Sequence, residues 1–262
     1  MTDYAIMPLT DYQNICDSVR AKTGGTEVLK SGDLPSAIEG IETGTAGIPF
    51  DSVSSFTYYP AGQYPDGNFV GSFPHATSLN FPNSKLTSID VTVTSSLKSF
   101  SLQPNGYSVK EVTIRGDMSG VTKLYRAFAT IGQALGANYI QKVYGLDFTS
   151  VTDAAGIFGG AVGLTTITIK PNTVNIALQI PECKNLTVES CINILNALKD
   201  RTDQNALTLT CHANLKTADT GRLYVNYVKL DADTGLYVLC EQTDEGAMTM
   251  ADAITAKNWT IA

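Results

Sequence analysis

Apolar residues recur at regular positions through the middle of the chain. The pattern apolar-x-x-apolar-x-apolar is complete in residues 86–91, 97–102, 109–114 and 164–169, and residues 121–124 and 140–143 match its first two apolar positions. Each match alternates apolar and polar side chains and is rich in β-branched residues, which is typical of a short strand. The middle of the chain is therefore predicted to consist of many short strands.

The spacing of these strands predicts how they are arranged. The middle apolar positions Ile89, Phe100, Val112 and Leu124 follow one another in steps of 11, 12 and 12 residues, and Val143 to Ile167 is a step of 24. One short strand cannot bury its apolar face alone, whereas stacked rungs share a continuous core. The pattern predicts a mainly β fold, a short-repeat β-solenoid with Ile89, Phe100, Val112 and Ile167 facing inward. The alternative is a set of unrelated strands in a β-sandwich.

The two ends of the chain follow a different pattern. Residues 1–43 predict a small helical module, in which Thr10 and Gln13 form a capping box, and which is too small to bury a core of its own. Residues 44–74 are rich in Gly, Pro and aromatics and predict a linker and the first strands. The solenoid is then expected over residues 75–185, and a C-terminal α/β cap over residues 186–262.

The cap is predicted from local signals. A helical stripe runs over residues 188–198 with Thr187 as its N-cap, a strand follows at 207–209, and a last helix at 249–257 precedes a strand at 259–261. Residues 218–225 and 232–238 have similar sequences, each indicating a turn that leads into a strand, so residues 223–239 predict a hairpin. This cap would cover the open end of the solenoid, where unpaired strand edges promote aggregation.

Charge and composition exclude several partners. The formal net charge is -7 and only 16% of residues are charged. No Lys/Arg cluster is present, so neither nucleic acid nor an anionic membrane surface is an expected partner. No apolar run reaches the ~18 residues that span a bilayer. The first residues lack a signal peptide, so we expect synthesis in the cytoplasm and, for any role outside the cell, release by another route such as lysis.

Reactive residues do not form a catalytic or metal-binding pattern, and we expect no enzyme, cofactor or metal. The five cysteines are odd in number and lack a Cys-x-x-Cys pair, which predicts buried free thiols. Asp219 and Asp233 each begin an Asp-Thr-Gly triplet, but they occupy equivalent turns of one predicted hairpin and not the facing lobes that an aspartic protease requires. Residues 231–235 resemble a calcium loop but place Gly at its fifth position, which favours a plain turn. His212 next to Cys211 points to the opposite face of a strand, so the pair is not expected to bind zinc.

Tyrosines are the remaining candidates for a binding site. Tyr224, Tyr227 and Tyr237 belong to the predicted hairpin, and Tyr64 to the aromatic segment before the repeats. Exposed tyrosines stack on sugars and anchor protein partners. The alternative for each is that it packs against the fold.

One stretch resembles a known repeat family. Residues 148–158, leading into residues 164–171, resemble the leucine-rich repeat of the bacterial surface-antigen type. Phe158, Leu164, Ile167, Ile169 and Pro171 match positions of its rung of about 23 residues, and Ile157 stands where that family has Ala. The resemblance extends loosely over residues 76–180 and implies a leucine-rich-like solenoid.

The ends resemble a narrower group. Residues 12–24 with 34–41 look like the N-terminal module of phage and prophage tail-region proteins from Gram-positive hosts, and residues 185–200 with 256–261 resemble their C-terminal cap. The Tyr-rich hairpin stands where those proteins have a short loop. The resemblance implies a virion tail, baseplate or fibre protein that is made in the host cytoplasm, forms homo-oligomers, joins other tail proteins through residues 1–43 and binds a host-surface glycan or protein.

Two alternatives stay open. The repeats also suit a bacterial leucine-rich-repeat adhesin, although the missing export signal disfavours it. A glycan-cleaving enzyme on a β-solenoid would require paired carboxylates in a groove.

Overall fold

The computed structural model describes residues 48–49, 53–57, 67–81, 86–102, 108–129 and 140–262. The chain separates into two units between Ala46 and Gly47, and every described residue belongs to the second. The helical module expected at residues 1–43, together with Cys16 and Tyr64, lies outside the described residues.

A parallel sheet forms one side of the second unit. It contains, in spatial order, β1 (Ile48–Pro49), β3 (Asn68–Phe73), β5 (Ser88–Val93), β7 (Glu111–Gly116), β8 (Lys142–Leu146) and β9 (Thr166–Ile169). The register aligns Phe69, Ile89, Val112, Val143 and Ile167 in one column across the sheet. All five side chains are buried. The inward orientation expected for Ile89, Val112 and Ile167 is confirmed.

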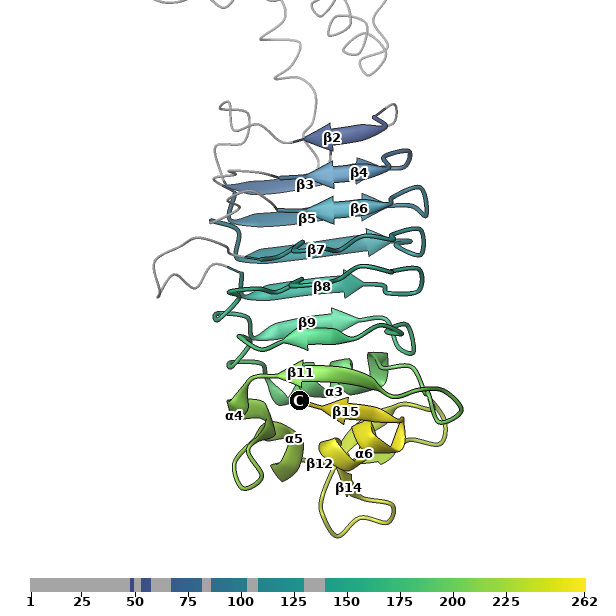
Figure 1. Ribbon diagram of the computed structural model, residues 1–262. Coiled ribbons are helices and arrows are strands. Elements are labelled where there is room, and N and C mark those ends of the chain that lie inside the picture. The colour runs from purple at the N-terminus through teal and green to yellow at the C-terminus, as the bar shows by residue number, and fades with distance from the viewer. Residues whose placement is uncertain (1–47, 50–52, 58–66, 82–85, 103–107, 130–139) are drawn as a thin grey trace, which may run out of the picture. The chain divides into compact units, whose positions relative to one another are not determined.

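A second parallel sheet lies beside the first. It contains β2 (Ser55–Thr57), β4 (Ser78–Asn80) and β6 (Ser99–Ser101), and single bridges from Ser99 to Lys123 and from Lys123 to Asp153 continue it. Phe100, on β6, is buried as expected. The stacked rungs confirm the β-solenoid and exclude the sandwich (Figure 1).

The two sheets explain the spacing of the repeat. Ile89 lies on β5 in the first sheet and Phe100 on β6 in the second, and the chain then returns to the first sheet at Val112. Ile89 and its ladder partner Val112 are 23 residues apart. A step of 11 or 12 residues therefore crosses from one sheet to the other, and two steps complete a turn.

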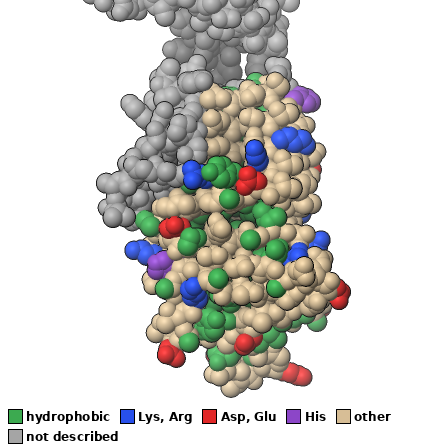
Figure 2. Space-filling model, in the orientation of Figure 1, with side chains coloured by type: hydrophobic (Ala, Val, Ile, Leu, Met, Phe, Trp, Pro, Cys, Tyr) green, Lys and Arg blue, Asp and Glu red, His purple; other side chains and the backbone are tan. Residues whose placement is uncertain are grey.

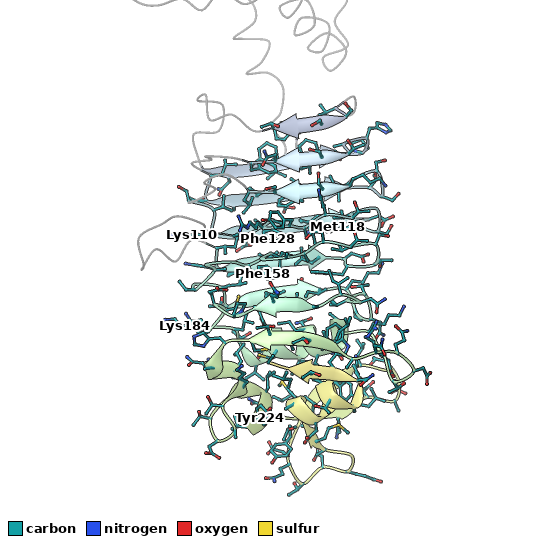
Figure 3. All side chains as sticks on the ribbon, viewed as in Figure 1. Lys110, Met118, Phe128, Phe158, Lys184 and Tyr224 are labelled. Atoms are coloured by element: carbon teal, nitrogen blue, oxygen red, sulfur yellow. The ribbon has the colours of Figure 1, made fainter. Side chains whose placement is uncertain are left out.

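Phenylalanines form a ladder inside the coil. The ring centroids of Phe81 and Phe100 are 5.8 Å apart, those of Phe100 and Phe128 are 5.6 Å apart, and those of Phe128 and Phe158 are 5.6 Å apart. The last two pairs are stacked, and Phe128 and Phe158 occupy successive rungs (Figure 3). Each rung thus places one large aromatic side chain on the next, a geometry favoured by ring quadrupoles.

A helix ends the first sheet. The corner hydrogen bond from Thr187 N–H to Thr165 O continues the ladder, but the chain then forms α3 (Val188–Ala197) where the next strand would be. The Ser190 hydroxyl accepts from Ile167 N–H at 3.1 Å and donates to Thr165 O at 3.0 Å, so it pairs backbone groups at the edge of β9. The helix and its Thr187 N-cap are confirmed, and the helix covers this end of the sheet as expected.

A third parallel sheet joins the end of the predicted solenoid to the cap. Its strands are β10 (Leu178–Ile180), β11 (Leu207–Cys211) and β15 (Trp259–Ile261), and α6 (Met250–Ala256) packs beside β15. The strands expected at 207–209 and 259–261 and the helix expected at 249–257 are confirmed. Trp259 is buried and donates its indole N–H to Lys199 O at 2.9 Å.

The described cysteines are free thiols, as expected. Cys183, Cys191 and Cys211 are buried, and Cys240 is partly exposed. Burial raises the pKa of the Cys191 and Cys211 thiols to about 12. The buried thiols therefore stay protonated at neutral pH and act as small apolar side chains. Within the described ranges, none of the helices has both the length and the apolar character needed to cross a bilayer.

Candidate interaction surface on the C-terminal cap

The cap carries a three-stranded antiparallel sheet. Strand β12 (Tyr227–Leu230) lies between β13 (Tyr237–Cys240) and β14 (Met248–Thr249). We call β12, β13 and their connecting turn the cap hairpin. In the turn, Asp231 N–H donates to Leu236 O at 2.8 Å, and the Asp231 carboxylate accepts from the Thr234 N–H at 2.9 Å and hydroxyl at 2.8 Å. These hydrogen bonds lower the pKa of Asp231. Residues 231–236 thus form a hairpin turn, as expected.

The hairpin begins later than predicted. Residues 218–225 resemble residues 232–238, but they lead into the short helix α5 (Arg222–Val225) and not into a strand. A Cβ on Gly221 would lie only 2.5 Å from Thr217 N and 2.7 Å from Leu215 O, so this segment packs closely on the preceding α4 (Ala213–Lys216), and Leu223 enters the core. The prediction of a strand at residue 223 is wrong because tertiary packing outweighs the local pattern.

Tyr237 connects the hairpin to the rest of the cap. Its backbone N–H donates to Asn196 Oδ1 at 2.7 Å, and its carbonyl accepts from Asn196 Nδ2 at 2.9 Å. The ammonium nitrogen of Lys257 lies 5.7 Å from the centre of its ring. Burial, with a smaller contribution from Asp200, raises the pKa of the Tyr237 hydroxyl. The backbone and ring of Tyr237 thus hold the hairpin against α3 and α6.

The other predicted tyrosines lie nearby. Tyr224 is half-buried on α5 and packs against the core (Figure 3). Tyr227 is half-buried at the first position of β12, where it pairs with Cys240 and Thr249. The fold brings Tyr224, Tyr227 and Tyr237 into one part of the cap, and packing occupies much of the surface of Tyr224 and Tyr237.

Aliphatic side chains provide the exposed surface of the hairpin. Leu230 is 57% exposed, Leu239 54%, Val225 46% and Val238 37%. Among the described residues the only other large hydrophobic side chains this exposed are Val70 and Tyr125. Leu230 and Leu239 share one face of the hairpin, since Leu239 pairs with Val228 and Leu230 lies two residues further along β12, and we call these two side chains the cap patch. Val238 and Leu239 lie on β13, an edge strand of this sheet, and Leu230 ends the central strand β12.

Lys257 stabilises the C-terminal end of α3, the helix whose Asn196 holds the hairpin. Its Nζ donates to Leu195 O at 3.0 Å and to Leu198 O at 2.8 Å, which pairs carbonyls at the C-terminal end of α3. Burial lowers the pKa of Lys257 to about 8, although the negative charge of Asp200 opposes this shift. The neutral amine still donates to these carbonyls, so deprotonation does not break the contact.

The depressed pKa of Lys257 predicts a dependence of stability on pH. Between about pH 8 and pH 10.5 the unfolded chain binds a proton on Lys257 that the folded chain has released. The free energy of unfolding of the wild type is therefore expected to rise through this range relative to Lys257→Met, which keeps the apolar stem but cannot titrate. Urea denaturation of both proteins at several pH values measures this difference. A difference that stays flat or falls above pH 8 contradicts the prediction.

An open groove of about 500 Å³ lies at the ends of β7, β8 and β9. The Lys170 ammonium contacts the Asp147 carboxylate at 2.8 Å. Burial opposes ionisation of Asp147, but hydrogen bonds from Lys170 and Thr149 outweigh it and lower the pKa. Hydrogen bonds from Ser119 lower the pKa of Asp117. Both carboxylates therefore favour the ionised form at neutral pH.

Glycines shape this groove. Gly116 and Gly145 have φ values of 84° and 81°. A Cβ on Gly116 would lie 2.2 Å from Val93 O, and one on Gly145 would lie 1.9 Å from Ile114 O. Only glycine fits where successive rungs approach this closely. The groove is therefore explained by the stacking of the coil.

The other reactive residues take structural positions. Asp219 and Asp233 lie in separate exposed turns, before α5 and at the hairpin tip. His212 is the N-cap of α4, where its Nδ1 accepts from Asn214 N–H at 3.1 Å. No three His, Cys, Asp or Glu side chains gather as a metal site in the part of the chain that the structure describes. Charged side chains are scattered over the face shown in Figure 2.

Comparison of the chain with protein-family models, with curated proteins and with solved structures finds no match.

Proposed function

We propose that this chain is a binding protein of a phage tail, baseplate or fibre, and that its cap hairpin contacts a partner on the host surface. The observation that carries the proposal is the cap patch, which concentrates exposed aliphatic side chains at one end of the β-solenoid. Apolar side chains that cluster on a surface mark interaction sites. A terminal cap can vary without disturbing the stacked core, which suits a recognition element.

The position of β13 supports the same proposal. It is an edge strand, with β12 on one side. Natural edge strands are usually protected by charge, proline or a covering element, whereas β13 presents Val238 and Leu239. A partner that covers this edge would bury apolar surface worth ~1.5–3 kcal/mol for each fully buried aliphatic side chain.

The virion setting rests on the resemblance of residues 12–24, 34–41, 185–200 and 256–261 to phage tail-region proteins. Mass spectrometry of particles purified after prophage induction tests it. Peptides of this chain in intact particles support the proposal. Their recovery only from the bacterial cell wall would favour the adhesin.

The contact itself is tested by removing the apolar surface. The double variant Leu230→Ser, Leu239→Ser is expected to bind a panel of Gram-positive cells at least roughly tenfold more weakly than the wild type. Both side chains are more than half exposed, so the free energy of unfolding should change by about 0.5 kcal/mol or less. Cell adsorption, urea denaturation and light-scattering mass are measured on each protein.

Val70→Ser is the matched control, because Val70 is 43% exposed but lies on the solenoid sheet and far along the chain from the cap. It should adsorb like the wild type. Equal adsorption of the double variant and the wild type would refute host binding by the hairpin. A fall in light-scattering mass of the double variant would instead identify the cap patch as a contact between copies of this chain.

A further inference from the structure

Arg126 has an unusual backbone conformation for its residue type. Its φ is 51°, and the other non-glycine residues with positive φ in the described ranges are Asn172 and Asn258. Asparagine tolerates this left-handed region, whereas a long side chain loses about 1–2 kcal/mol there. Such strain persists where the surrounding structure imposes it, and it is found often at functional sites.

The next rung uses glycine at the same place. Hydrogen bonds from Leu124 N–H to Asp153 O, from Arg126 N–H to Ala155 O and from Phe128 N–H to Ile157 O align the two turns. In this alignment Arg126 corresponds to Gly156, which has a φ of 60°. The same turn therefore forms with glycine one rung away, and the coil does not require arginine at this point.

The Arg126 side chain extends over the surface of the coil. A Cβ on Gly156 would lie 3.5 Å from Arg126 Cγ, so the arginine stem crosses the bare backbone of the next rung. Its guanidinium carbon lies 5.1 Å from the ring centre of Tyr125. Tyr125 is 48% exposed. Among the described residues, it is the one aromatic in the group of exposed large hydrophobic side chains. Both side chains are exposed, whereas the next two residues, Ala127 and Phe128, are buried.

The guanidinium is available to a ligand. Among the described residues, no ion pair within 4 Å involves Arg126. Lys123, exposed on the same rung, adds a second positive charge. The nearest carboxylate along the ladder, Asp153, accepts a hydrogen bond from Ala155 N–H at 3.2 Å. The cation–π contact with Tyr125 restrains the Arg126 side chain, which reduces the entropy lost when it binds a planar anion.

We propose that Tyr125 and Arg126 form a binding site for an acidic saccharide on the side of the solenoid. Tyr125 offers its ring to the apolar face of a sugar, and Arg126 pairs with the carboxylate of a uronic-acid unit through two parallel N–H donors. Ala155 on the next rung is small and exposed, which leaves room beside the pair for an extended saccharide. This site is separate from the cap hairpin and does not depend on the function proposed above.

Isothermal titration of the full chain with a galacturonic acid tetramer tests the proposal, with a neutral galactose tetramer as the reference ligand. The wild type should bind the acidic tetramer more tightly than the neutral one. Arg126→Gly should weaken binding of the acidic tetramer at least roughly tenfold. Its free energy of unfolding should equal or exceed that of the wild type, because the strain at this position is relieved. Tyr125→Ala should weaken binding of both tetramers.

Lys110→Ala is the control for charge, because it removes an exposed cation from another part of the coil and should leave the affinity unchanged. Three results would overturn the proposal: no binding of the acidic tetramer by the wild type at millimolar concentration, equal binding by Arg126→Gly, or a lower stability of Arg126→Gly. An oligoglutamate peptide serves as the third ligand. Binding of this peptide as tight as that of the acidic tetramer, with no loss in Tyr125→Ala, would identify a site for acidic protein and refute the saccharide.

Discussion

Ile167→Asp is expected to unfold the solenoid at room temperature. Ile167 is fully buried on β9 and lies in the apolar column next to Val143. The substitution removes a large aliphatic side chain, which costs about 2–5 kcal/mol, and places a carboxylate where no described cation reaches. Because single domains are stable by about 5–15 kcal/mol, the combined loss removes most of the stability. Urea denaturation followed by circular dichroism measures it.

Thr166→Asp is the matched control for this prediction. Thr166 is the preceding residue on β9, it faces outward, and it pairs across the ladder with Lys142. The same carboxylate should therefore change the free energy of unfolding by about 0.5 kcal/mol or less. If both variants unfold like the wild type, the inward register of β9 is wrong.

Phe128→Ala is expected to lower the free energy of unfolding by about 3–5 kcal/mol. The ring stacks between Phe100 and Phe158 at 5.6 Å on each side, so its removal leaves a cavity that interrupts the ladder. Both neighbouring rungs lose their aromatic contacts together. Thermal and urea denaturation of the purified variant measure the loss.

Phe128→Leu separates the aromatic contribution from the loss of volume. It fills most of the space and should cost clearly less than the alanine variant, by analogy with conservative core substitutions. An alanine variant as stable as the leucine variant would show that the ladder is not tightly packed at Phe128. A change of the denaturant m-value in the alanine variant would indicate instead that the rungs unfold separately.

Local signals in the sequence predict α3, β11, α6 and β15 in the cap. Thr187 and Thr249 precede apolar helical stripes, and both act as side-chain N-caps in the structure. The alternation around Ile89, Val112 and Ile167 places these side chains inside the coil. These features depend on interactions between residues close in the chain or on a period of two, so they can be read without knowledge of the fold.

The candidate surfaces were predicted less completely. The sequence drew attention to the tyrosines of the hairpin, yet the exposed area belongs to the aliphatic cap patch, and Tyr237 is half-buried against α3. The sequence did not single out Arg126 as a candidate site residue, because its positive φ is visible only in the folded backbone. A comparison of residues 124–128 with residues 154–158 would have shown an arginine aligned with a glycine, and this was the available signal.

The sequence by itself determined that the chain stacks short strands, because the period-two alternation and the regular spacing of apolar triplets are local properties that only a shared core satisfies. Only the tertiary structure decided that alternate triplets belong to two different sheets. It also decided that residues 222–225 form a helix, while the similar residues 236–238 lie in or beside a strand. The exposure of Leu230 and Leu239 is likewise visible only in the structure. These outcomes depend on contacts between segments distant in the chain. Gly221 packs on α4, no described strand pairs with the outer side of β13, and Gly156 leaves room for Arg126. Local preference is worth less than such packing, so similar sequences adopt different structures in different surroundings.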